Sequence, residues 1–437
     1  MKTLRDYPVQ KIKIEEKAVE DLLMKLAKVG QVGETGVSRL AYSPEWVEAV
    51  EICRAYGSAA GLEMRQDAVG NLWARLEGKT PGPVIATGSH IDSQDPGGRY
   101  DGALGVVAGL ISLAALKEQA GQPEHTLEAV VLCEEEGSRF PTSGFWGSRG
   151  IVGKITPDDL QTTLSFAGEP IGAVMSGIGL DPTRVAEAVR GDIGAFIELH
   201  IEQGPILESA DLPVGLVSAI TGMGQFEITI DGQDNHAGAF PMDLRRDPMA
   251  GFAEIASSLI DHAHRLGRPA VTTIGQCKIE PGGTAVVPSR VTFSLDARHP
   301  DPEARRTLYA TQDRLMSEIC ARRGLGYSRK QLINLEPCQS DAAILETMKT
   351  AANHLGTPHL KMVSGAGHDS QQMALIAPVA MIFARSAGGR SHTPEEFSTI
   401  SDCTVGVNVL AQTLYQMGYG PPAPETIVQM DQRPVMH

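Results

Sequence analysis

The chain has 437 residues and a formal net charge of −15, from 38 Lys and Arg against 53 Asp and Glu. A hydrophobic fraction of 42% with 21% charged residues excludes a disordered chain. The acidic balance argues against nucleic-acid or polybasic membrane partners, which need clustered positive charge.

At about 150 residues per domain, the length predicts two or three domains. Ser43-Pro44-Glu45 begins a helix with an N-cap, a proline at its first position and an early acid. Helical apolar spacing recurs at residues 104–117 and 399–417. Buried strands are expected at residues 83–87, 127–133, 195–199 and 378–384. Their continuous apolar character is typical of a mostly parallel sheet covered by helices on both faces, so the fold class is α/β.

The pattern changes between Gly222 and Leu335. Residues 226–230 and 291–295 alternate between apolar and polar, which predicts strands with one covered face. Residues 249–266 and 302–322 are helical in period. An antiparallel sheet with two helices would form a smaller α+β domain at 222–335, inserted into a large catalytic domain formed by 1–221 and 336–437.

Compartment and order are also expected from composition. Six scattered cysteines without a C-x-x-C motif predict reduced thiols rather than disulfides. The start of the chain lacks a signal-peptide core, and no apolar run approaches the roughly 18 residues of a membrane span. We therefore expect a cytoplasmic protein without membrane partners. The proline-rich tail from Gly420 is expected to be loosely ordered.

Histidines and acids of the kind that bind metals follow the expected strands. They are His90, Asp101, Glu136, His200 and His392. In an open α/β sheet, ligands bind at the carboxyl ends of the strands. Five protein ligands exceed the three that one open catalytic zinc usually has, so two ions bridged by a carboxylate fit better. Asp92, two residues after His90, suits the orientation of a ligand imidazole.

Each of these residues also has a structural interpretation. A lone His at a strand end is more often a hydrogen-bonded structural residue, and the triple Glu134–Glu136 is typical of a solvated loop. However, three acids directly after a buried strand need compensating cations. The joint pattern therefore favours a metal site.

Seven strings occur in an order that looks like a known family. They are Gly88–Ser93, Gly97–Gly105, Glu135–Phe140, Glu198–Pro205, His236–Gly238, Gly367–Asp369 and Ser391–Glu396. They resemble the N-carbamoyl-L-amino-acid hydrolases, the β-ureidopropionases of the yeast type and the allantoate amidohydrolases. These belong to the wider group of dinuclear metallo-aminoacylases and carboxypeptidases. The resemblance runs from about Arg39 to Met417.

The resemblance implies a role for each matching residue. The metal ligands are His90, Asp101, Glu136, His200 and His392, with Asp101 as the bridge between two divalent ions of Zn, Mn, Co or Ni. Glu135 is the general base. His236 stabilises the oxyanion and reaches in from the partner subunit of a homodimer, so the inserted domain serves as lid and dimerisation domain. Gln203, Arg298 and the backbone of Gly388 and Gly389 contact substrate.

The implied activity is hydrolysis of a non-peptide C–N bond in an N-carbamoyl-L-amino acid or related ureido acid. The products are the amino acid, ammonia and carbon dioxide. Alternatives are hydrolysis of another amide, an allantoate amidohydrolase, and a metal-binding or regulatory protein that has lost catalysis. The intact Glu135 and the five ligands argue against the last.

Two departures from the family pattern bear on the substrate. Ala285 stands where an Asn is usual, and Arg385 and Arg390 add cations near the expected pocket mouth. They indicate either altered recognition of the acid, or rim arginines with water in place of the missing amide.

Overall fold

The computed structural model describes residues 10–420. The chain folds into two compact units. Among the described residues, unit 1 comprises residues 10–218, 340–362 and 368–420, and unit 2 comprises residues 219–339 and 363–367. The tail predicted to be loosely ordered lies outside the described residues except for Gly420, as do the first nine residues.

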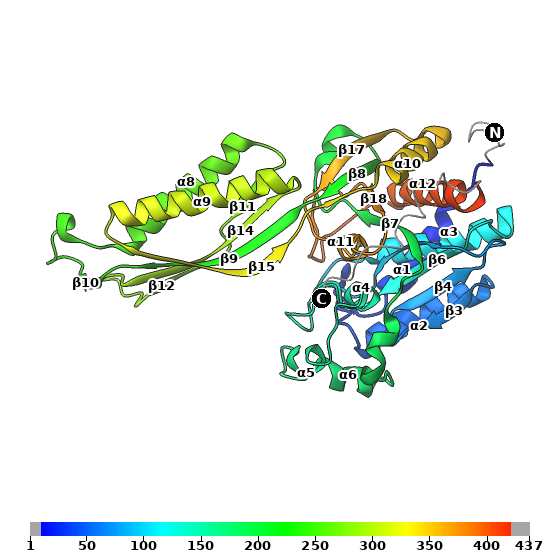
Figure 1. Ribbon diagram of the computed structural model, residues 1–437, viewed down its shortest axis with the longest axis horizontal. Coiled ribbons are helices and arrows are strands. Elements are labelled where there is room, and N and C mark those ends of the chain that lie inside the picture. The colour runs from blue at the N-terminus through cyan, green and yellow to red at the C-terminus, as the bar shows by residue number, and fades with distance from the viewer. Residues whose placement is uncertain (1–9, 421–437) are drawn as a thin grey trace. The chain divides into compact units, whose positions relative to one another are not determined.

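The main sheet is mixed and has nine strands, most of which belong to unit 1 (Figure 1). The strands are β3 (Glu63–Gln66), β4 (Leu72–Leu76), β5 (Val84–His90), β6 (Leu127–Leu132), β7 (Ile193–Ile201), β8 (Val214–Ile220), β16 (Cys338–Gln339), β17 (His359–Ser364) and β18 (Val379–Ala384). The central order β18-β7-β5-β6 is parallel, and antiparallel strands flank it. Every residue of β5, β6 and β18 is buried, as expected for strands covered on both faces. The predicted α/β class is confirmed, with parallel pairing confined to the centre.

Helices pack around this sheet, and those predicted at residues 104–117 and 399–417 and after Ser43 are among them. They include α1 (Glu16–Ala27), α2 (Pro44–Ala59), α3 (Ala103–Ala120), α10 (Ala342–Leu355) and α12 (Ile400–Tyr419). The Ser43 side chain accepts a hydrogen bond from the Trp46 amide, which confirms the predicted N-cap. Shorter helices are α4 (Trp146–Ile151), α5 (Asp159–Thr162), α6 (Ile171–Gly177), α7 (Ile206–Ala210) and α11 (Ser370–Met373).

One expectation about hydropathy was wrong. Helix α3 has 18 residues and a mean hydropathy of 1.4, so by length and composition it is apolar enough to cross a membrane. However, 72% of it is buried within the protein, and its leucines and valines belong to the main core. Its apolar character therefore reflects a helix packed at the centre of the sheet, with glycine and serine among its aliphatic residues.

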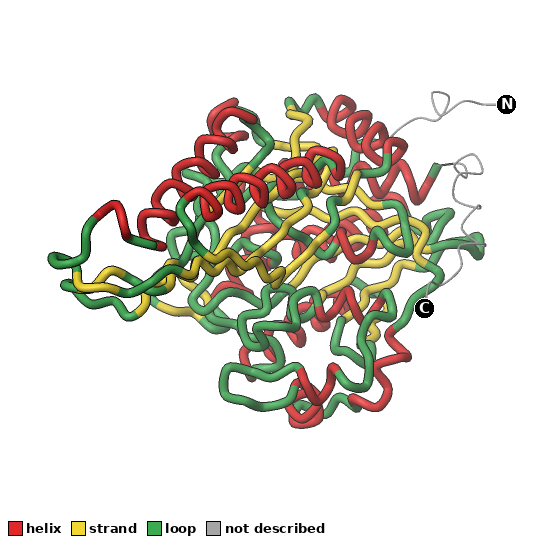
Figure 2. The backbone as a smooth tube through the Cα atoms, turned by 60° about the vertical axis from the view of Figure 1, so that its left-hand side comes forward, coloured by secondary structure: helices red, strands yellow, loops and turns green. Residues whose placement is uncertain are grey.

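Unit 2 is an antiparallel sheet with two helices, seen in Figure 2 as yellow and red segments. Its strands are β9 (Gly222–Asp231), β11 (Val271–Thr273), β12 (Cys277–Glu280), β14 (Arg290–His299) and β15 (Gly326–Leu335), with a separate ribbon of β10 (Asn235–His236) and β13 (Val286–Val287). Alternate residues of β9 and β14 are buried against α8 (Pro248–Leu266) and α9 (Pro302–Arg322). The α+β architecture expected for this segment is confirmed.

Candidate metal centre

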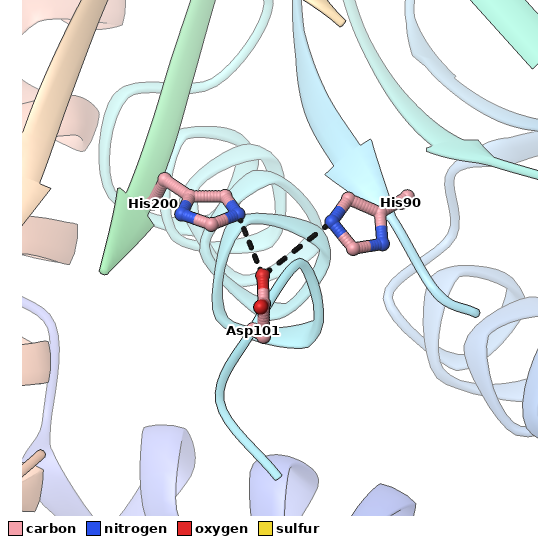
Figure 3. A group of neighbouring side chains, drawn as sticks. All are labelled: His90, Asp101 and His200. Carbon is pink, nitrogen blue, oxygen red and sulfur yellow. Dashed lines mark ion pairs between the residues drawn. The ribbon is translucent and has the colours of Figure 1, made fainter. Parts of the chain in front are cut away.

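Two neighbouring parallel strands deliver histidines to the same side of Asp101. His90 ends β5 and His200 lies near the end of β7, which pairs with β5. The Nε2 atoms of His90 and His200 lie 3.6 and 3.0 Å from Asp101 Oδ1 (Figure 3). Asp101 itself lies two residues before α3, so a helix start presents its carboxylate to two strand ends.

The other carboxylate oxygen of Asp101 faces a different pair. His392 Nε2 lies 3.3 Å from Asp101 Oδ2 and 3.5 Å from Glu136 Oε2. Ligand atoms of Asp101, Glu136 and His392 all lie within 4.8 Å of one another, as do those of His90, Asp101 and His200. Asp101 is thus shared by two groups of three, which is the arrangement a bridging carboxylate needs.

The tautomers of both strand histidines suit metal binding. His90 Nδ1 lies 3.0 Å from the Asp92 carbonyl, and His200 Nδ1 lies 2.9 Å from the Ile201 carbonyl. A carbonyl can only accept, so each Nδ1 carries a proton, and Nε2, the atom that faces Asp101, is the nitrogen that gives up its proton when a metal binds. The Gly102 amide lies 3.3 Å from His200 Nε2 and can donate to this nitrogen once it is unprotonated.

The buried charges of the site also fit cations. Burial opposes ionisation of Asp101, but hydrogen bonds from His200, His392 and His90 hold the pKa of its carboxyl well below the usual range. Burial and the charge of Asp101 raise the pKa of Glu136 to about 7, and Glu136 Oε1 is buried without a hydrogen-bond partner. An acceptor of this kind is costly unless something positive binds it. The residues present therefore fit a pair of divalent ions.

Glu135 lies beside the ligand His90. Its Oε2 is 3.8 Å from His90 Nε2. Burial raises the pKa of Glu135 well above the usual range, against the attraction of His90, and the charges of Glu136 and Asp369 raise it further. A carboxyl with a raised pKa can accept a proton and return it near neutral pH.

Asp92 acts on the glutamates as well as on His90. Its carboxylate accepts hydrogen bonds from the amides of Glu135 and Glu136 at 3.2 and 3.1 Å. Its Oδ1 lies 3.8 Å from His90 Nδ1, farther than its own carbonyl oxygen. The backbone carbonyl of Asp92 therefore orients the His90 imidazole, and its side chain orients the amides of Glu135 and Glu136.

Gln203, expected to contact substrate, lies against the bridging acid. Its Nε2 donates to Asp101 Oδ2 at 2.9 Å and to Ser391 Oγ at 3.1 Å. The Gly388 amide donates to Glu208 Oε2 at 2.8 Å. A Cβ on Gly389 would lie 2.8 Å from the Gly204 carbonyl carbon, so this loop closely approaches the turn after β7.

Two predicted residues belong to unit 2. Nδ1 of the exposed His236 accepts hydrogen bonds from the amides of Gly238 and Ala239, which leaves the proton on Nε2 as a donor. Arg298 donates to both carboxylate oxygens of Asp296 at 2.8 and 3.1 Å and to the Gly365 carbonyl at 2.8 Å. Its guanidinium is thus held in one orientation.

The family departures have distinct surroundings. The Ala285 carbonyl accepts from the Ala237 amide at 2.9 Å, so Ala285 adjoins the ribbon that carries His236. Arg385 donates to Asp402 at 3.0 and 3.1 Å and to Asp211 at 3.0 Å. These ion pairs favour the interpretation of Arg385 as an anchored rim residue, whereas Arg390 is exposed.

Sequence reasoning assigned no role to several buried residues around the site. The His368 ring lies 4.7 Å from the His200 ring, centroid to centroid. Glu198 accepts from the hydroxyls of Ser89 and Ser370 at 2.9 and 2.7 Å. Glu396 contacts the backbone of Asp101. The strings Gly367–Asp369, Glu198–Pro205 and Ser391–Glu396 contained the signal, since they hold these residues beside the ligands.

Comparison with known proteins agrees with this geometry. Residues 86–416 match peptidase family M20/M25/M40. The chain is 40% identical over 401 residues to an N-carbamoyl-L-amino acid amidohydrolase of Geobacillus stearothermophilus, covering 91% of this chain and 97% of the relative. It is 37% identical over 411 residues to an allantoate amidohydrolase of Bacillus subtilis (strain 168), covering 94% and 99%. The crystal structure of a hydantoinase/carbamoylase family amidase from Burkholderia multivorans superposes with a TM-score of 0.88 at 32% identity, covering 94% and 100%.

Proposed function

This chain is a C–N hydrolase of peptidase family M20/M25/M40 and belongs to the hydantoinase/carbamoylase amidases within it, and we propose that its substrates are N-carbamoyl-L-amino acids. The observation that carries the proposal is the position of Asp101 between two groups of ligands, with Glu135 beside them. A ureido carbonyl is a poor electrophile, so its hydrolysis needs strong polarisation and a proton shuttle.

Two divalent ions, held by His90, Asp101, Glu136, His200 and His392, would supply Lewis acidity and lower the pKa of the attacking water. Glu135 takes a proton from that water and delivers it to the leaving nitrogen. The Nε2–H of His236 donates to the oxyanion. Arg298, already oriented by Asp296, holds the carboxylate of the substrate with its remaining N–H groups. Water and an N-carbamoyl amino acid give the amino acid, ammonia and carbon dioxide.

The second candidate substrate is allantoate. The similarity of the chain to an allantoate amidohydrolase is nearly the same as to a carbamoylase. Allantoate is also a ureido acid, so the ligands and Glu135 would serve it in the same way. Ala285 supports a third possibility, an amide whose acid group does not need the missing side chain.

The test is a substrate panel with protein reconstituted with Zn, Mn, Co or Ni. The panel holds N-carbamoyl-L-amino acids, their D enantiomers, allantoate, and N-formyl and N-acetyl amino acids, with ammonia and free amine as the products measured. We expect the highest kcat/KM on an N-carbamoyl-L-amino acid. Glu135→Gln should remove turnover and keep both ions, whereas Glu63→Gln, at an exposed position of β3, should keep activity. A preference for allantoate or for N-acyl compounds would replace the proposed substrate.

We also propose a cytoplasmic homodimer in which His236 completes the partner's site. Mixing refolded His236→Ala and Glu135→Gln chains tests this arrangement. Half of the chains pair as heterodimers, and each heterodimer has one site with both residues intact, so about a quarter of wild-type activity should return. No recovery in a mixture shown to exchange subunits would contradict the proposal.

A further inference from the structure

We propose that Glu396 is a positioning residue that fixes the bridging ligand Asp101 relative to His392. The inference rests on the proposed dinuclear site and adds a residue that does not itself bind the ions. It concerns the group formed by Asp101, Glu136 and His392.

One carboxylate oxygen of Glu396 holds the backbone of the bridging residue. Glu396 is 2% exposed. Its Oε1 accepts hydrogen bonds from the amides of Tyr100 and Asp101 at 2.9 and 3.0 Å. Two adjacent amides that converge on one carboxyl oxygen fix the backbone at Tyr100 and Asp101, because each hydrogen bond restricts the direction of its N–H group.

The other oxygen binds the loop that carries His392. Glu396 Oε2 accepts from Ser391 Oγ at 2.8 Å, and the same hydroxyl lies 3.0 Å from Asp101 Oδ2. Glu396 thus connects Ser391, which adjoins one ligand, to the backbone of another ligand 295 positions away in the sequence. The separation of the two ligands depends on this connection.

Gly98 is the steric counterpart of this contact. A Cβ at position 98 would lie 2.5 Å from the Glu396 Cβ, and closer still to its carboxyl group. Gly98 is not among the glycines with positive φ. Alanine at this position therefore displaces Glu396 without straining the local backbone. This gives a way to move the carboxylate without removing it.

The experiment compares metal affinity across matched variants. Divalent-ion affinity and stoichiometry are measured by competition with a chromogenic chelator and by elemental analysis, using Zn and Mn, on the full chain. Glu396→Ala should lower affinity by about 10–100-fold, the range typical for residues that orient ligands. Glu396→Gln should lose less, because its amide oxygen still accepts from both backbone amides. Glu395→Gln, at the exposed neighbouring position, should bind as wild type does.

A merely structural role is separated by two further readouts. Gly98→Ala should also lose affinity. The double variant Gly98→Ala/Glu396→Gly, which lacks both the carboxyl group and the Cβ that a side chain at position 98 would meet, should be no worse than Glu396→Gly. In addition, the midpoint of thermal unfolding is measured for each variant without and with added metal. The increase in midpoint that metal produces should be smaller in Glu396→Ala than in the wild type. A structural residue would lower the midpoint equally with and without metal.

The outcomes decide between this inference and the proposed function. Folded Glu396→Ala that binds two ions with wild-type affinity overturns the role of Glu396 and leaves the metal site standing. If Glu396→Ala does not fold, unchanged affinity in Gly98→Ala overturns the role equally. A wild-type chain that binds no pair of ions removes the proposed dinuclear site and this inference with it.

Discussion

Substituting Gly102 with alanine should damage the metal site and the fold together. Gly102 precedes α3 with φ +63 and ψ −50, a conformation that residues with a side chain rarely adopt. A Cβ there would lie 2.5 Å from His90 Nδ1 and 2.6 Å from His90 Nε2, whereas ordinary contact begins at 3.4 Å. The imidazole cannot easily turn away, because its Nδ1 is bound to the Asp92 carbonyl.

The magnitude follows from these two effects. Backbone strain at this conformation costs about 1–3 kcal/mol, and overpacking of a buried site costs about 1–3 kcal/mol. We therefore expect a loss of about 2–6 kcal/mol in the free energy of unfolding. To restore ordinary contact, His90 Nε2 must move by about 0.8 Å. Metal–ligand distances tolerate about 0.2 Å, so His90 would no longer serve as a ligand and metal affinity should fall more than about 100-fold.

Urea unfolding of the metal-free protein and a metal titration measure the two effects separately. Gly121→Ala is the matched control, because Gly121 follows the same helix with φ +76 and a Cβ there would meet nothing within 4 Å. The control should lose about 1–3 kcal/mol from backbone strain and keep its metal affinity. Equal losses of stability in the two variants, or wild-type metal affinity in Gly102→Ala, would refute the reasoning.

Three other perturbations follow from the site. Metal affinity should rise with pH up to about 9, because the ions must displace protons from two ligands. Hydrogen bonding to Asp101 raises the pKa of His392 to about 9, and burial raises the pKa of Glu136 to about 7. Calorimetry in two buffers of different ionisation enthalpy measures the proton release, and equal heats in the two buffers would contradict it. Arg298→Lys should raise KM for N-carbamoyl amino acids about tenfold or more with a smaller change in kcat, because a guanidinium fork matches a carboxylate. Asp296→Asn should raise KM less, because Asp296 only orients the guanidinium. Steady-state kinetics measures both effects, and an unchanged KM in Arg298→Lys would exclude substrate binding by Arg298. Arg39→Met should lower the free energy of unfolding in urea by about 3 kcal/mol or more, because the buried guanidinium of Arg39 donates to three backbone carbonyls. A loss below about 1 kcal/mol would show that water replaces the guanidinium.

Much of the fold was predictable because its signals are local. Continuous apolar runs predicted β5, β6, β7 and β18, and alternation predicted β9 and β14. Capping residues and apolar period predicted α2 and α12. The helix at α3 was predicted as well, but its apolar run is longer than expected, since burial at the centre of a protein and burial in a membrane select similar side chains.

The order of residue types along the chain was enough to place histidines and acids at the strand ends, and so to predict an imidazole and carboxylate site at one edge of the sheet. Three contacts became known from the folded chain: the two oxygens of Asp101 face different histidines, Gln203 donates to Asp101, and Glu396 accepts from the Asp101 backbone. These contacts join residues about 100 to 300 positions apart, and their geometry depends on side-chain packing and hydrogen-bond direction. Neither of these is encoded in the local periodicity of the chain, whereas strand and helix patterns are.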